Sequence, residues 1–144
     1  MRGSERDCTV TGERPVIVMA CGDSLESSQV GEMMISRMTE GRLITVDRAM
    51  QAAFLRPCGR VTLVILDGCE GSALLTPALQ RIRRRWPEAS AVVIGPSRGE
   101  PGLELAARRG GASFLIRPVS RETWQALLSH AARLERIRVE ERLG

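Results

Sequence analysis

Short apolar runs alternate along the chain with stretches in which apolar residues recur every three or four positions. The longest run covers residues 61–66 and ends at Asp67 and Gly68. An apolar run rich in β-branched residues and closed by an acid and a glycine is typical of a strand buried on both faces of a parallel sheet. Runs of the same kind predict four further strands, at residues 16–20, 43–46, 91–94 and 113–116.

A stretch with helical spacing follows each predicted strand. The helix expected after residues 43–46 takes Asp47 as its N-cap. Its apolar face is expected to comprise Ala49, Met50, Ala53 and Phe54. Five strand-then-helix units predict an α/β protein in which helices cover both faces of a five-stranded parallel sheet through right-handed crossovers. This three-layer sandwich is the flavodoxin-like arrangement, which serves many functions.

The chain has 144 residues, 43% of them hydrophobic, which suits one domain with a single core. We expect this domain to span residues 15–133. Residues 1–14 are polar and aperiodic and are expected to form a flexible N-terminal tail, and residues 134–144 are expected to be a helical extension or linker.

The last predicted helix starts near Ser120 and runs past the expected domain. It carries an apolar stripe formed by Trp124, Leu127, Leu128, Ala131 and Leu134. A helix that projects alone into water is marginally stable, so the stripe and its charged flanks favour pairing with a second copy. We predict a homodimer through this helix; the alternative is a frayed, solvated tail on a monomer.

The net charge is +4, and all 21 basic residues are arginines. They are mostly scattered and no aromatic residues are interleaved with them, which disfavours specific nucleic-acid binding. The cluster at residues 81–85 is expected to be a solvated face in preference to a phosphate-binding patch. No apolar run approaches the roughly 20 residues needed to cross a bilayer, so no membrane partner is expected. The four cysteines lack metal-ligand spacing and no signal peptide precedes them, which predicts a reduced, cytoplasmic protein.

Candidate chemistry gathers where the predicted strands end, because ligands of open α/β sheets bind beyond the carboxyl ends of the strands. Asp67 lies there, and Cys21 and Cys69 are both expected at the carboxyl ends of adjacent strands. A thiolate of lowered pKa at one of these cysteines would permit redox or nucleophilic chemistry. The only histidine, His130, is placed away from this edge, and the chain has neither a P-loop nor a dinucleotide-binding glycine motif.

Over residues 15–133 the order and spacing resemble the CheY-like receiver domain of bacterial two-component response regulators. Three marks carry the resemblance: Asp67 after the third strand, Phe114 in the fifth, and Arg117-Pro118 after it. The resemblance implies that Asp67 is like the phosphoacceptor, Phe114 like the switch aromatic, and Arg117 like the phosphate-contacting lysine, before a proline whose peptide bond is usually cis. It also implies phosphorelay signal transduction without enzymatic activity.

The partners that the resemblance implies are proteins, either a histidine kinase or an output domain. Receivers commonly dimerise through the face that includes their last helix, which agrees with the predicted homodimer. DNA would be bound only through an output region that is not part of this sequence.

The sequence departs from receivers where they hold Mg²⁺ and phosphate. The acidic pair after the first strand is replaced by Cys21 and Gly22, which leaves Asp23 and Asp67 as a weak or absent Mg²⁺ site. No other cofactor is implied. The hydroxyl residue that closes the fourth strand is replaced by Gly95, with Ser97 two positions later as a second phosphate-contact-like residue.

These departures remove groups that would neutralise charge during phosphoryl transfer. We therefore predict a degenerate pseudo-receiver that acts by protein–protein interaction, in which Arg117 forms an ion pair with Asp67. The alternative is a phosphorylatable receiver that uses Asp67 with a shifted metal. A lesser alternative is a thiol-based redox or small-molecule-binding flavodoxin-like protein.

Overall fold

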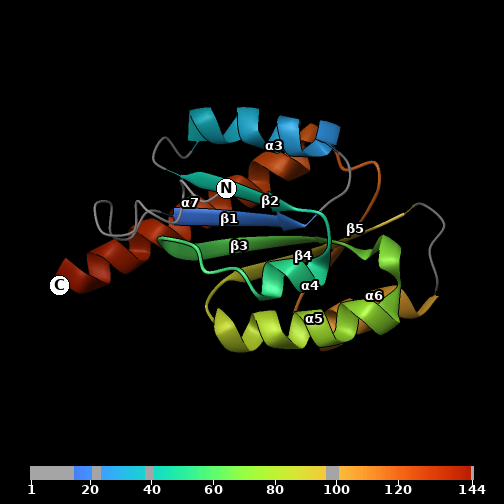
Figure 1. Ribbon diagram of the computed structural model, residues 1–144. Helices are drawn as coiled ribbons and strands as arrows, with labels where there is room; N and C mark the ends of the chain where they lie inside the picture. Colours follow the sequence, from blue (N-terminus) through green and yellow to red (C-terminus); the bar gives the residue numbers. More distant parts are fainter. Residues whose placement is uncertain (1–14, 21–23, 38–40, 97–100, 144) are drawn as a thin grey trace.

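The structure, a computed structural model, describes residues 15–20, 24–37, 41–96 and 101–143 (Figure 1). Five parallel strands form one sheet in the order β2-β1-β3-β4-β5. This order confirms the predicted flavodoxin-like α/β fold. The strands are β1 (Pro15–Ala20), β2 (Arg42–Val46), β3 (Arg60–Asp67), β4 (Ser90–Gly95) and β5 (Ser113–Ile116).

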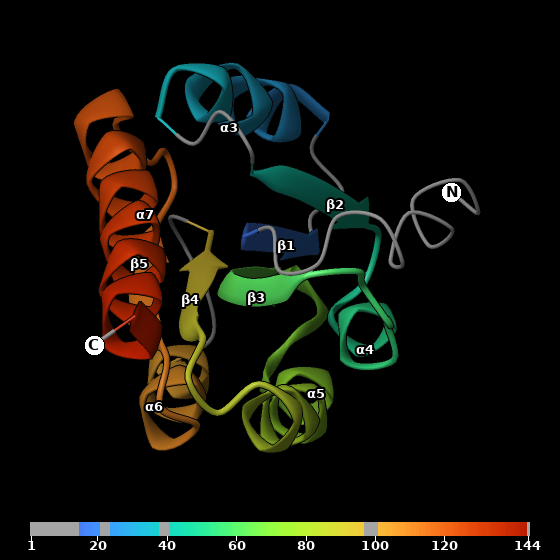
Figure 2. The ribbon, with the colours of Figure 1, turned by 90° about the vertical axis from the view of Figure 1, so that its left-hand side faces the viewer.

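Helices form a layer on each face of the sheet, as Figure 2 shows with the strands seen nearly end-on. One layer consists of α3 (Ser24–Arg37) and α7 (Arg121–Leu143). The other consists of α4 (Ala49–Ala53), α5 (Ser72–Arg85) and α6 (Pro101–Arg109). A single 3-10 turn, η1 (Gly68–Glu70), follows β3.

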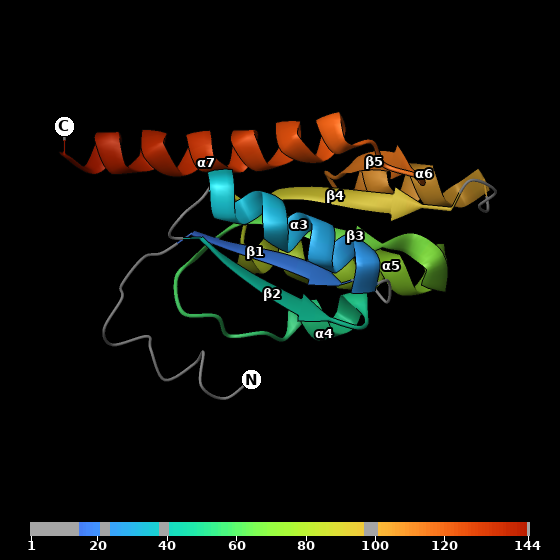
Figure 3. The same cartoon turned by 90° about the horizontal axis from the view of Figure 1, so that it is seen from above.

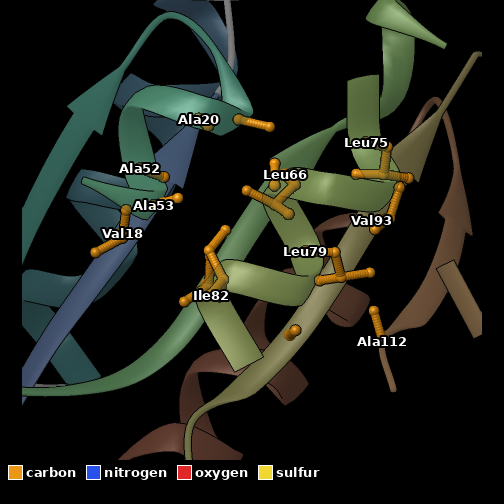
Figure 4. Close-up of a cluster of buried hydrophobic side chains, with 14 of the residues drawn as sticks. Val18, Ala20, Ala52, Ala53, Leu66, Leu75, Leu79, Ile82, Val93 and Ala112 are labelled. Atoms are coloured by element: carbon orange, nitrogen blue, oxygen red, sulfur yellow. The ribbon is translucent and has the colours of Figure 1, made fainter. Parts of the chain in front are cut away.

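The central strand β3 is buried from Val61 to Leu66, as its apolar run predicted. Alternate residues point to opposite faces, so Val64 and Leu66 join the core under α4 to α6, whereas Leu63 and Ile65 join the core under α3 and α7. Figure 4 shows part of the first core. The side chains that α5 contributes to this core are those of Leu75, Ala78, Leu79 and Ile82.

The short helix α4 differs from its predicted form. Its N-cap is Arg48 and not Asp47, and the side-chain carbonyl of Gln51 accepts hydrogen bonds from the backbone N–H groups of both residues, at 2.9 and 3.0 Å. Phe54 was expected on the buried face but is 60% exposed, because the helix ends at Ala53. The buried residues of α4 are Ala49, Ala52 and Ala53.

The last helix buries Trp124, Leu128 and Ala131 against the sheet, and Leu127 is half-buried, as the predicted stripe requires. The helix continues unbroken to Leu143, and Figure 3 shows it running beyond the end of the sheet. The expected domain end at Arg133 therefore falls inside one continuous helix. The side chain of Leu134, the last member of the stripe, lies outside the described residues.

None of the helices in the described part of the chain is both long enough and apolar enough to span a membrane. The longest, α7, carries arginine and glutamate in its first turn and again from Arg133 onward.

Candidate functional site

The carboxyl ends of β3, β4 and β5 bring together three of the predicted site residues. In the strand register, Asp67 of β3 lies opposite Ile94, and Gly95 of β4 lies opposite Ile116, the residue before Arg117. The backbone N–H of Arg117 donates a hydrogen bond of 2.9 Å to the carbonyl of Gly95. Residues far apart in sequence thus meet at one edge of the sheet.

Asp67 and Arg117 form a two-pronged ion pair at this edge. Nη2 of Arg117 donates to Oδ2 of Asp67 at 2.8 Å, and Nη1 donates to Oδ1 at 3.2 Å. The side chain of Asp67 is 11% exposed and that of Arg117 is 24% exposed, so solvent screens the pair only partly. A guanidinium that binds both oxygens of a carboxylate fixes its orientation as well as its charge. The predicted ion pair is confirmed.

A second donor holds the same carboxylate. The backbone N–H of Cys69 donates to Oδ1 of Asp67 at 2.9 Å, so Asp67 also caps the turn η1. Burial raises the pKa of Asp67, but the hydrogen bond from Arg117, followed by that from Cys69, outweighs it and holds the pKa below its ordinary value. Asp67 is therefore ionised at neutral pH.

The space beside Asp67 is filled by apolar side chains from α6 and β5. A Cβ atom placed on Gly95 would lie 2.5 Å from Cζ of Phe114 and 3.3 Å from Cδ2 of Leu103. A Cβ atom on Gly68 would lie 2.7 Å from Leu103. Both glycines let large side chains pack directly on the backbone. The ring of Phe114 thus takes the room that a serine or threonine side chain at Gly95 would need.

The described residues at this edge do not fit a Mg²⁺ ion. Magnesium prefers several oxygen ligands in octahedral geometry, and both oxygens of Asp67 already face the guanidinium of Arg117. Within the described ranges, no group of three metal-ligating side chains comes together. Asp23, the other acid predicted for this site, lies outside the described residues, as do Cys21, Gly22 and Ser97.

Neither of the two cysteines in the described part of the chain supports thiolate chemistry at this edge. Burial raises the pKa of Cys69, and the neighbouring Asp67 raises it further by charge repulsion and hydrogen bonding. The expectation of a lowered pKa is therefore wrong for Cys69. Cys58 is disulfide-bonded, and its partner is not Cys69, which is free. The expectation that every cysteine is reduced is therefore wrong for Cys58.

Sequence reasoning missed two features of the site: the backbone donor at Cys69 and the inward ring of Phe114. Glycine at the end of a strand was the available signal, because it permits another side chain to approach the backbone closely. The peptide bond between Arg117 and Pro118 is cis, as the resemblance implied.

No protein-family model matches the sequence, and no curated protein sequence matches it. Solved structures match it well in shape. A response regulator from Thermotoga maritima superposes with a TM-score of 0.65 at 17% identity, covering 83% of this chain and 98% of that one. The beryllofluoride-activated NtrC4 receiver domain dimer gives 0.61 at 18% identity, covering 84% and 98%.

A third structure is described as an adenylate cyclase from Rhodopirellula baltica. It superposes with a TM-score of 0.68 at 12% identity and covers 91% of this chain and 96% of that one. Receiver domains recur among these neighbours, and nearly their whole length is matched. With its 2-1-3-4-5 sheet, its acid at the end of β3 and its cis Arg117-Pro118 bond, the chain has the CheY-like fold of response-regulator receiver domains.

Proposed function

We propose that this chain is a pseudo-receiver: a receiver-like signalling module that binds a protein partner and accepts no phosphoryl group on Asp67. The observation that carries the proposal is the pairing of both Asp67 oxygens with Arg117, at 2.8 and 3.2 Å. An oxygen that attacks phosphorus has to be free to approach it, and here each carboxylate oxygen has a donor in place.

The surroundings of Asp67 support the same proposal. Phosphoryl transfer depends on cations and donors arranged around the three equatorial oxygens of the transferred group. Where a receiver offers a hydroxyl for this purpose, the chain has Gly95, and the ring of Phe114 fills the space above it. Because the guanidinium of Arg117 neutralises the carboxylate of Asp67, this edge of the sheet would be held in one conformation.

Treatment with acetyl phosphate and Mg²⁺, followed by intact-mass measurement, tests the proposal. We expect no gain of a phosphoryl group, under conditions in which an ordinary phosphorylatable receiver gains one. The matched control is Asp67→Asn, which removes the acceptor and keeps the size of the side chain. A mass gain that appears in the wild type and disappears in Asp67→Asn would show that Asp67 is a phosphoacceptor and would overturn the pseudo-receiver proposal.

The partner class that we propose is a histidine kinase or an output domain, together with a second copy of the chain. The unbroken helix α7 supports the homodimer, because 23 residues extend about 34 Å, whereas a six-residue strand extends about 20 Å. The part of α7 that projects beyond the sheet has no other element of the described chain beside it (Figure 3).

A further inference from the structure

A groove runs between α4 and α5, on the face of the sheet opposite to α7. Its volume is about 650 Å³. We call it the arginine groove and define it by five of the residues that line it: Phe54, Pro77, Arg81, Arg84 and Arg85. The helix α5 starts near Asp67 and runs away from it, so the arginines lie toward the opposite edge of the sheet (Figure 1).

Contacts within the protein hold two of the three arginines in place. Nη1 of Arg85 donates to the backbone carbonyl of Ala53 at 3.0 Å, and its guanidinium carbon lies 5.0 Å from the ring centre of Trp86. The guanidinium carbon of Arg81 lies 5.0 Å from the ring centre of Phe54. Side chains that are already ordered lose less entropy when a ligand binds. The groove is therefore partly preorganised.

The positive charge of the groove is not neutralised by its own helices. Neither α4 nor α5 contains an acidic residue. Among the described residues, no ion pair joins Arg81, Arg84 or Arg85 to a carboxylate. Arg84 is exposed, and Phe54, which lines the same groove, is 60% exposed. A guanidinium cluster next to an uncovered ring has the composition of the centre of a protein interface, where arginine and aromatic residues are enriched.

We propose that the arginine groove binds an acidic segment of a partner protein. Carboxylates of that segment would pair with Arg81 and Arg84, and an apolar side chain would pack on Phe54 and Pro77. A nucleic acid fits less well, because Arg81 and Arg85 are only about 6 Å apart along the helix axis. Arginines within that distance can contact only two or three phosphates, whereas the affinity for nucleic acid grows with the number of phosphates neutralised.

This inference deepens the proposed function by naming a surface and a partner chemistry for protein binding. The groove lies apart from Asp67, so the two proposals fail separately. Phosphorylation of Asp67 would leave the groove untouched, and loss of peptide binding at the groove would leave the acetyl phosphate result unchanged.

The test uses the full chain labelled with ¹⁵N and three probes: a short peptide that alternates acidic with leucine and phenylalanine residues, the same peptide with amides in place of its acids, and an oligothymidylate. We expect the acidic peptide to shift the amide signals of Phe54 and the last turns of α5. The amide peptide should bind at least about tenfold more weakly, because its neutral groups cannot form ion pairs with the arginines.

The variant Arg81→Glu/Arg84→Glu should abolish binding of the acidic peptide. A charge-matched control, Arg121→Glu/Arg133→Glu on α7, should retain it within about twofold. All four side chains are exposed, so both variants should fold, which circular dichroism would check. The proposal is overturned if the acidic peptide shifts no groove signals at millimolar concentration, or binds equally well to the groove variant. Tighter binding of oligothymidylate at the same residues would overturn it in favour of a nucleic-acid surface.

Discussion

Asp67 and Arg117 join two segments that are fifty residues apart, and their pairing should stabilise the fold. Removing the carboxylate in Asp67→Ala leaves a partly buried guanidinium without that partner, and we expect the free energy of unfolding to fall by about 1–3 kcal/mol. Urea unfolding measures this loss. In a double-mutant cycle, Arg117→Ala should add little once Asp67 is gone.

The effect of Asp67 should depend on pH, with a sign that follows from its lowered pKa in the folded chain. The pair contributes stability above the ordinary aspartate pKa of about 4, and loses it as the pH falls through the folded-state pKa. The stability difference between the wild type and Asp67→Asn should therefore shrink in acid. An unchanged or raised stability of Asp67→Ala at neutral pH would instead indicate a carboxylate strained by its site, as functional carboxylates often are.

Gly95 should tolerate no side chain while Phe114 keeps its position. In Gly95→Ala the new Cβ would meet Cζ of Phe114 at 2.5 Å, so the ring has to move, at a cost of about 1–3 kcal/mol. Gly31→Ala is the matched control, because its Cβ would lie 3.7 Å from Leu43, an ordinary contact, inside the helix α3. That change should be neutral or stabilising by up to about 1 kcal/mol.

Thermal unfolding of both glycine variants separates crowding at Gly95 from the general effect of replacing glycine. If the ring of Phe114 is the obstacle, Gly95→Ala/Phe114→Leu should recover part of the stability lost in Gly95→Ala, measured against Phe114→Leu alone. If Gly95→Ala lowers the stability equally in the wild type and in Phe114→Leu, the ring of Phe114 does not fill this space in solution.

We expect the helix α7 to determine whether the chain forms a dimer. We expect the full chain to sediment as a dimer at tens of micromolar, and a chain ending at Arg133 to sediment as a monomer, because the truncation removes the part of α7 that projects beyond the sheet. The truncated chain keeps Trp124, Leu128 and Ala131, so its core should remain folded. If the full chain and the truncated chain both sediment as monomers, the projecting part of α7 is only a linker.

The elements also show where sequence reasoning succeeded and where it did not. The apolar stripe of α5 agrees with the helical spacing expected after each strand, because Leu75, Ala78, Leu79 and Ile82 recur every three or four positions and all are buried. Aspartate is a favourable N-cap residue, yet Arg48 and not Asp47 takes the N-cap position of α4. Gln51, the third residue of the helix, accepts a hydrogen bond from the backbone N–H of Arg48 and so fixes where the helix begins. In a helix as short as α4, one such contact decides the boundary, and Phe54 falls outside it.

For the whole molecule, the sheet order could be predicted because five buried strands alternate with helices, and chirality leaves few ways to connect them. The Asp67–Arg117 pair was expected from the resemblance to receivers, in which Asp67 takes the place of the phosphoacceptor and Arg117 that of the phosphate-contacting lysine. The position of the Phe114 ring was not predicted, although a glycine at the end of β4 signals that a side chain approaches the backbone there. The disulfide at Cys58 could not be predicted, because it depends on a three-dimensional distance that no local pattern encodes.

The direction of α7 has a practical consequence. It starts after β5 at the edge that holds Asp67 and ends beyond the opposite edge (Figure 3). A chain immobilised by a tag at the far end of this helix would therefore stand on a sensor surface with the Asp67 edge pointing into the flowing solution. The tag would act as a stalk, and analytes could reach that edge without steric interference from the support.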